Sequence, residues 1–219
     1  MEVRPKVYDR QKQFFSEAYR KGKIGWPRTG HSRLVELLVA SPWFLSGARV
    51  LEIGSGEGRN LLPFLERKCE VVAFDFIHEP LMVARERTGR EQHLQRIGFV
   101  QGDLFSLPFR EGSFDVVFDF GVFHHLRRRE RLAYPRWISR ILRAGGIAGL
   151  GVFSELFRHS PDENRTRFFV THRGHHDVFF REHEIPHLLG RDFQMEASDT
   201  EETGDGLSHY RVAVYRKRE

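Results

Sequence analysis

Residues 54–58, which read Gly-Ser-Gly-Glu-Gly, form the stretch of the sequence best suited to hold a ligand. The apolar run Arg49–Ile53 precedes them, with Glu52 near its end, and Asn60 then leads into the apolar residues 61–65. The first run predicts a buried parallel strand and the second predicts a helix. A strand, a glycine turn and a helix make the nucleotide-binding arrangement of doubly wound α/β folds, because glycine lets the backbone turn sharply and approach a ligand closely.

The spacing of these glycines and the charges beside them indicate which kind of ligand is favoured. Dinucleotide-binding folds use Gly-x-Gly-x-x-Gly, whose third glycine lets the helix pack closely on the strand. Here the pattern is Gly-x-Gly-x-Gly, and Arg59 holds the place of that third glycine. Glu52 and Glu57 flank the turn, and carboxylates at such a place disfavour a phosphate. They suit a ligand that carries cationic groups, such as an amine and a sulfonium.

Further acidic residues close the next strands of the predicted sheet. Asp75 ends the apolar run at 69–75, and Asp103 follows the short run at 98–101. A carboxylate at the tip of the second strand can accept hydrogen bonds from both ribose hydroxyls of a nucleoside, or it can cap the next helix. Since open α/β sheets bind ligands at the carboxyl ends of their strands, we expect these residues to lie beside the glycine turn.

Several stretches resemble, in order and spacing, the motifs of the class I S-adenosylmethionine (SAM) methyltransferases. Residues 51–58 resemble motif I, and Asp75 matches motif II. Residues 114–126, Phe-Asp-Val-Val-Phe-Asp-Phe-Gly-Val-Phe-His-His-Leu, resemble motif IV of small-molecule methyltransferases. Residues 140–146, Arg-Ile-Leu-Arg-Ala-Gly-Gly, resemble the signature that precedes the fifth strand, with Ala144 where proline is usual.

The resemblance implies a doubly wound, Rossmann-like α/β fold with a mostly parallel seven-stranded sheet, an antiparallel terminal strand and an N-terminal helical cap. Residues 15–30 resemble the N-terminal segment of the small-molecule branch, which includes thiopurine, thiol/halide and tellurite-resistance type methyltransferases. In that branch a tryptophan-containing loop covers the cavity, so Trp26 is either a cofactor contact or a core residue. We divide the chain into a helical cap segment at 1–44 and a SAM-binding methyltransferase domain at 45–219.

The resemblance also implies a set of cofactor-binding residues. An aspartate at the position of Asp103 accepts from the adenine amino group in this family, and the following backbone N–H meets a ring nitrogen. Asp119 and Phe120 would flank the methionine part of SAM, with backbone carbonyls and the Asp119 carboxylate available to its ammonium group. The predicted cofactor-binding residues are Trp26, Glu52, Gly54, Ser55, Gly56, Gly58, Asn60, Asp75, Phe76, Asp103, Leu104, Asp119 and Phe120.

Two adjacent histidines supply the candidate catalytic groups. SAM carries its methyl group on a positively charged sulfur, so transfer is an in-line displacement in which the protein mainly places the reactants. An acceptor thiol or hydroxyl can need its proton removed, and histidine suits this role because its ordinary pKa of about 6.5 is close to working pH. We predict His124 or His125 as this base, with His124 ranked first. The alternative is that both are loop histidines bonded to the backbone.

Hydrophobic periodicity predicts the remaining elements of the sheet and its covering helices. We expect helices at 8–20, 34–38, 79–84, 128–142 and 181–189, a glycine C-cap at 143–146, and strands at 147–154, 193–197 and 209–216. The two last strands fit an antiparallel terminal pair.

Composition narrows the class of protein. The 219 residues suffice for one α/β domain, and no apolar run of about 18 residues predicts a membrane span. A single cysteine, Cys69, fits a reducing cytoplasm and is interpreted as a packing residue. The net charge is +5, but basic and acidic residues are interspersed, which argues against nucleic acid as a partner. A small-molecule acceptor is expected, and the oligomeric state is left open.

Residues 157–176 are rich in histidine, arginine and phenylalanine, in a region where the family inserts structure that recognises the acceptor. Recognition of an anionic or aromatic acceptor is one interpretation, and a solvated loop is another. His172, His175 and His176 with Asp177 also suggest a metal site. Their spacing fits no standard site and the neighbouring arginines would repel a cation, so we predict no metal.

The leading interpretation is a SAM-dependent methyltransferase that acts on a small-molecule thiol, hydroxyl or other nucleophile. An RNA or protein methyltransferase is the first alternative. Enzymes that methylate exocyclic amino groups commonly carry Asn/Asp-Pro-Pro-Tyr/Phe after the fourth strand, and residues 119–122 read Asp-Phe-Gly-Val instead. A non-catalytic, SAM-binding regulatory domain is the second alternative.

Overall fold

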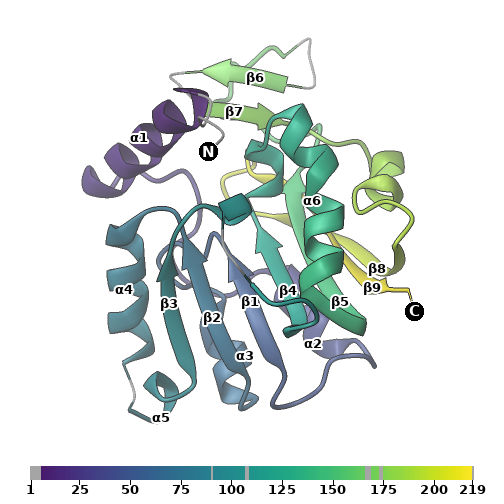
Figure 1. Ribbon diagram of the computed structural model, residues 1–219. Coiled ribbons are helices and arrows are strands. Elements are labelled where there is room, and N and C mark those ends of the chain that lie inside the picture. Colours follow the sequence, from purple (N-terminus) through teal and green to yellow (C-terminus); the bar gives the residue numbers. More distant parts are fainter. Residues whose placement is uncertain (1–5, 90, 107–108, 166–168, 173–174, 219) are drawn as a thin grey trace.

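A seven-stranded sheet in the order β3-β2-β1-β4-β5-β9-β8 forms the centre of the molecule (Figure 1). The structure is a computed structural model, and it describes residues 6–89, 91–106, 109–165, 169–172 and 175–218. Strands β1 to β5 pair in parallel, and β9 pairs antiparallel with both β5 and β8. The strands are β1 Arg49–Ile53, β2 Glu70–Asp75, β3 Ile97–Gln101, β4 Phe114–Phe120, β5 Leu142–Phe153, β8 Phe193–Glu202 and β9 His209–Lys217.

Helices cover both faces of this sheet, as the apolar strands require. One face packs against Tyr134, Trp137 and Ile138 of one long helix, and the other against two short helices and the helix after β2. The helices are α1 Lys6–Arg20, α2 Arg33–Ala40, α3 Leu61–Glu66, α4 His78–Thr88, α5 Glu91–Leu94 and α6 Arg128–Ile141. Short 3₁₀ turns are η1 Leu104–Ser106, η2 Phe123–His125 and η3 Glu182–His187. The predicted Rossmann-like fold is confirmed, including the reversed terminal strand.

Helix α1 and a small hairpin lie over the carboxyl ends of the parallel strands (Figure 1). The hairpin pairs β6, Phe169–His172, with β7, His175–Val178. Strand β7 contacts both α1 and η2. Two segments that are far apart in the sequence therefore cover the sheet edge where strand order reverses around β1, which is where such folds bind ligands.

Three local expectations are corrected or fall outside the described part of the chain. Residues 181–189 form the 3₁₀ turn η3 with Pro186 inside it, not an α-helix. The glycine C-cap expected at 143–146 is absent, because α6 ends at Ile141 and β5 begins at the next residue. Arg167, Phe168 and Arg173 of the basic, aromatic segment lie outside the described residues.

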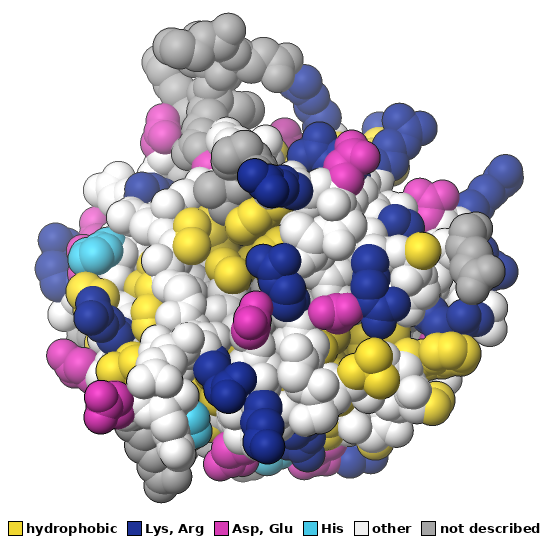
Figure 2. Space-filling view, turned by 60° about the horizontal axis from the view of Figure 1, so that its bottom comes forward, with side chains coloured by type: hydrophobic (Ala, Val, Ile, Leu, Met, Phe, Trp, Pro, Cys, Tyr) yellow, Lys and Arg dark blue, Asp and Glu magenta, His cyan; other side chains and the backbone are white. Residues whose placement is uncertain are grey.

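The surface at the amino ends of the strands carries mixed charges. Figure 2 shows Lys and Arg side chains interspersed with Asp and Glu and with small apolar patches on this face. Ion pairs such as Arg33–Asp199 and Arg216–Glu196 cross between neighbouring elements. No helix in the described ranges has both the length and the apolar character that crossing a bilayer demands.

Candidate functional site

A cavity of about 580 Å³ lies at the carboxyl ends of the strands, beneath α1. Its volume is within the usual range for small-molecule sites. The predicted residues that line it are Trp26, Glu52, Gly54, Ser55, Gly56, Asn60, Asp75, Phe76, Asp103, Leu104, Phe120, His124 and His125. Gly58 and Asp119 are not among its lining residues.

The glycine turn after β1 forms one wall of the cavity, and two of its glycines are required sterically. Gly54 has φ +66°, and a Cβ there would lie 2.2 Å from Cγ2 of Val122. Gly58 has φ +79°, and a Cβ there would lie 2.9 Å from Cβ of Ala84 on α4. Gly58 therefore lets the turn pack against α4 and does not face the cavity.

Glu52, at the end of β1, is a buried carboxylate in the cavity wall. Oε1 accepts a hydrogen bond of 3.4 Å from Nδ2 of Asn60, while Oε2 has no hydrogen-bond partner among the described residues. Burial raises the pKa of Glu52 to about 8. Because an unpaired buried acceptor is costly, this oxygen suits a ligand that brings a donor or a positive charge.

Asp75, at the tip of β2, is bonded to the backbone near the start of α4 and also lines the cavity, and its contact with a ribose stays a prediction. Oδ1 accepts from the backbone N–H of Ile77 at 2.9 Å, at the start of α4, and Oδ2 accepts from the N–H of Gly56 at 3.0 Å. The carboxylate also lines the cavity, and burial raises its pKa to about 6. Each oxygen retains lone pairs for a ligand hydroxyl.

Asp103 lines the cavity at the start of η1 and also shapes that turn. Oδ1 accepts from the N–H of Phe105 at 3.1 Å, and Oδ2 accepts from Oγ of Ser106 at 3.1 Å. The turn places the neighbouring Leu104 against the cavity. Trp26 lines the cavity too, with its ring 5.9 Å from Phe15. Trp26 is half-buried and lies outside the buried core, and its contact with a cofactor stays a prediction.

Two carboxylates that were expected to serve a cationic ligand are already paired. Glu57 accepts from Nε of Arg28 at 2.8 Å and from Nη2 of Arg87 at 2.6 Å, so it ties the loop before α2 to α4. Asp119 accepts from the hydroxyl of Tyr134 and, at 2.8 Å, from the N–H of Val122. Asp119 is not among the cavity-lining residues and each of its oxygens already accepts a hydrogen bond, so its expected contact with the SAM ammonium group stays a prediction.

The hydrogen bonds of His124 and His125 indicate which of the two can act as the base. Nδ1 of His124 accepts from the backbone N–H of Phe153 at 3.2 Å, so the proton of this neutral ring is on Nε2. Nε2 of His124 lies 3.1 Å from Nε2 of His125, which must then accept. Burial holds the pKa of His124 well below its usual value. His124 is thus bonded to the backbone, as the alternative interpretation stated, and His125 is the ring with a basic nitrogen at the cavity.

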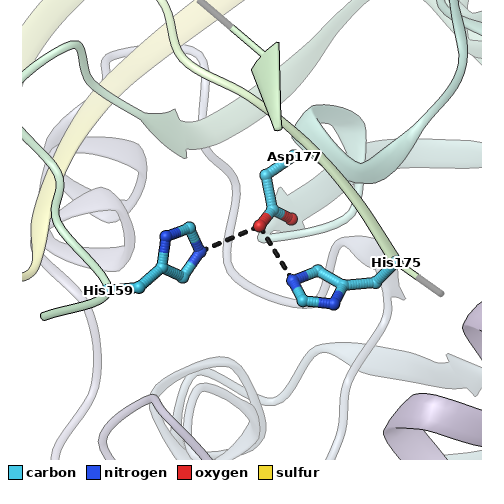
Figure 3. A group of neighbouring side chains, drawn as sticks. All are labelled: His159, His175 and Asp177. Atoms are coloured by element: carbon cyan, nitrogen blue, oxygen red, sulfur yellow. Dashed lines mark hydrogen bonds and ion pairs between the residues drawn. The ribbon is translucent and has the colours of Figure 1, made fainter. Parts of the chain in front are cut away.

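Asp177 fixes the orientation of His125, a role that no sequence motif indicated. Its Oδ1 accepts from Nδ1 of His125 at 2.7 Å, and its Oδ2 accepts from Nε2 of His159 at 2.8 Å and from Nε2 of His175 at 2.9 Å (Figure 3). Asp177 is fully buried. Although burial opposes it, hydrogen bonds from three imidazoles hold the Asp177 pKa well below its usual range.

The cluster differs from the group considered in the sequence. His159 joins His175 and Asp177, whereas the side chain of His176 points to the other face of β7, where burial and Arg127 lower its pKa to about 4. The side chain of His172 lies outside the described part. Strand alternation could have paired His175 with Asp177, but nothing in the spacing pointed to His159.

Comparisons with known proteins agree with this geometry. Residues 51–150 match the family described as "Methyltransferase domain". The crystal structure of Burkholderia thailandensis 1,6-didemethyltoxoflavin-N1-methyltransferase, with bound 1,6-didemethyltoxoflavin and S-adenosylhomocysteine, superposes with a TM-score of 0.80 at 25% identity. The match covers 100% of this chain and 92% of that one. The match supports a SAM-dependent methyltransferase domain over residues 51–150. SAM is its cofactor.

Two further relatives are methyltransferases of small molecules. The chain is 33% identical over 111 residues to the ubiquinone/menaquinone biosynthesis C-methyltransferase of Dinoroseobacter shibae, a match that covers 49% of this chain and 43% of the relative. It is 30% identical over 123 residues to the 27-O-demethylrifamycin SV methyltransferase of Amycolatopsis mediterranei, covering 56% and 44%. The chain thus spans less than half of either relative, and membership of the thiopurine, thiol/halide and tellurite-resistance branch stays a prediction.

Proposed function

We propose that this methyltransferase transfers a methyl group to a small-molecule acceptor that carries an ionisable O–H, N–H or S–H group. The observation that carries the proposal is His125, whose Nδ1 is held by Asp177 and whose Nε2 is the basic nitrogen at the cavity. The Burkholderia enzyme, an N1-methyltransferase of 1,6-didemethyltoxoflavin, supports an N–H acceptor.

The residues around the cavity fit SAM by their chemistry. Glu52 offers a buried oxygen with no partner in the described structure, and Gly56 leaves room where a Cβ would lie 2.8 Å from the hydroxyl of Tyr19. We propose that Asp75 binds the ribose hydroxyls and that Asp103 and Leu104 bind the adenine. Trp26, Phe76 and Phe120 would complete the walls. When bound, SAM supplies a methyl group on a positively charged sulfur.

His125 would act on the acceptor and not on SAM. Its Nε2 takes the acceptor proton after the acceptor displaces the N–H of His124, and the resulting imidazolium is stabilised by Asp177 at 2.7 Å. Phe15 and Phe153 lie beside His125, with ring centroids 5.0 and 5.6 Å away. These faces suit a flat, apolar acceptor.

A SAM-to-S-adenosylhomocysteine assay across phenols, thiols, amines and N–H heterocycles tests this function. With the acceptor that turns over, His125→Asn should lower kcat by about 10²–10⁴-fold, since positioned acid–base catalysis contributes this much. Asp177→Asn should also lower kcat and should shift the pH dependence of kcat, because the amide of this variant no longer holds the proton of His125 on Nδ1.

His183→Ala, on the exposed turn η3, is the control for replacing a histidine and should keep wild-type turnover. SAM affinity by calorimetry should stay near wild type in all three variants. Undiminished kcat in His125→Asn would refute the base, and SAM binding without turnover for any acceptor class would favour the regulatory alternative. No observation on the described surface favours the RNA or protein methyltransferase.

A further inference from the structure

His159, His175 and Asp177 form a compact group beside His125, and the proposed methyl transfer uses only Asp177 of the three (Figure 3). His159 follows β5, and the other two residues lie on one face of β7. Nε2 of His159 and Nε2 of His175 lie 2.8 and 2.9 Å from Oδ2 of Asp177, and the three atoms lie within 4.8 Å of one another. Three donor atoms from two segments thus converge on one point.

We propose that these three side chains bind a divalent first-row metal ion, with zinc the best match. Two imidazole nitrogens and one carboxylate oxygen are a donor set that zinc uses, at bond lengths of about 2.0–2.2 Å, with water in the fourth position. Ligand atoms at the observed separations need only small side-chain rotations to reach such bonds. This proposal replaces the prediction of no metal, which was made without His159.

The surroundings of the group match those of a metal site. Metal-binding histidines usually donate their second N–H to a carboxylate or carbonyl, and ligating carboxylates are themselves hydrogen-bonded. Nδ1 of His159 lies 3.0 Å from Oε2 of Glu163, and Oδ1 of Asp177 accepts from Nδ1 of His125. Both outer contacts are therefore already in place.

Charge and access also permit an ion. The guanidinium of Arg165 pairs with Glu163 at 3.0 Å and lies over the ring of Phe179, so its charge is balanced locally. The side chain of His159 is 38% exposed, whereas Asp177 is 1% exposed. An ion can approach along His159 and reach a buried carboxylate.

The test uses the full chain after treatment with a chelator. Zn²⁺ is titrated by calorimetry at pH 7.5, and Co²⁺ is titrated with visible absorption as the readout. We expect one ion per chain with micromolar or tighter affinity, and Co²⁺ bands typical of nitrogen and oxygen ligands. His159→Ala and His175→Ala should each weaken binding about tenfold or more.

His187→Ala, on the exposed turn η3, controls for ion capture by surface imidazoles and should bind as wild type does. Absence of saturable binding to the wild type, or unchanged affinity in both ligand variants, would overturn the proposal and leave a hydrogen-bonded network only. S-adenosylhomocysteine affinity reports whether each variant is folded. If His175→Ala loses that affinity, the variant is not folded, and the test then depends on His159→Ala, which changes a more exposed side chain. Metal binding is measured without turnover, so its outcome is separate from that of the proposed function.

Discussion

Asp75 and Asp119 show how partners decide the role of a residue. Both are buried aspartates near the carboxyl ends of parallel strands, β2 and β4, that flank β1. Burial raises the pKa of each, to about 6 and about 7. Asp75 faces the cavity and bonds only to backbone N–H groups, whereas Asp119 accepts from the hydroxyl of Tyr134. Of the two, only Asp75 lines the cavity and can present its remaining lone pairs to a ligand there.

Replacement of Asp75 tests its proposed role in binding the ribose. Asp75→Ala should weaken SAM binding by about 1.5–3 kcal/mol, because it removes hydrogen bonds to a charged acceptor. Calorimetry with SAM measures the change, and circular dichroism checks that the turn after β1 survives. Asp162→Ala, on an exposed loop, is the matched control and should bind SAM normally. Equal affinity in both variants would remove the ribose role.

Among the elements, the loop before α2 is joined to the glycine turn and to α4 by ion pairs of one carboxylate. Glu57 binds Arg28 of that loop and Arg87 of α4. Hydrogen bonds from Arg59 to Gly30 and from Arg87 to Arg28 add to this connection. Arg28 is half-exposed, and the contact is open to screening by salt. Because Trp26 lies two residues from Arg28 and lines the cavity, opening of this contact would uncover the site.

Arg28→Ala should therefore release S-adenosylhomocysteine several-fold faster than wild type. Stopped-flow displacement measures the dissociation rate, and higher salt should accelerate the wild type more than the variant. Lys21→Ala, which breaks the exposed pair with Glu17 on α1, serves as the comparison and should release the ligand at the wild-type rate. Identical rates in Arg28→Ala and wild type would show that the loop is held by other contacts.

Local patterns predicted the elements well and the contacts between distant segments poorly. Apolar runs predicted β1, β2 and β4, and the position of Asp75 at the end of such a run predicted its place at a strand tip. Both patterns extend over only a few residues of sequence. Asp177 meets His125 across 52 positions through the placement of a hairpin, which no local periodicity encodes. The 3₁₀ turn η3 was missed for a local reason, since Pro186 interrupts an α-helix there.

For the whole molecule, the buried acids make stability depend on pH. Burial raises the folded-state pKa of Glu52 to about 8, above the value near 4.5 of an exposed glutamate. The folded protein therefore binds more protons than the unfolded chain between these values, and the free energy of unfolding falls as pH rises through this window. Asp119, with a pKa of about 7, acts in the same direction.

The ligand-free protein should lose thermal stability between pH 6.5 and 8.5, and Glu52→Gln should lose less. Differential scanning fluorimetry at a series of pH values measures both. Saturating S-adenosylhomocysteine should reduce the slope of the wild type, if its donors reach Glu52. A slope that is the same in wild type and Glu52→Gln would show that Glu52 does not titrate in this range.

The cover of the sheet by two separate segments, α1 and the β6–β7 hairpin, has a consequence for how substrate range can change. Helix α1 and the β6–β7 hairpin bring Phe15, His175 and Asp177 to the acceptor side, while the strand tips present the groups proposed for SAM. Substrate range can therefore diverge by exchange of these two segments, provided that Tyr19 of α1, which lies against the glycine turn, is kept. A chimaera that takes both segments from a relative should acquire that relative's substrate, and a chimaera with only one should be inactive on either.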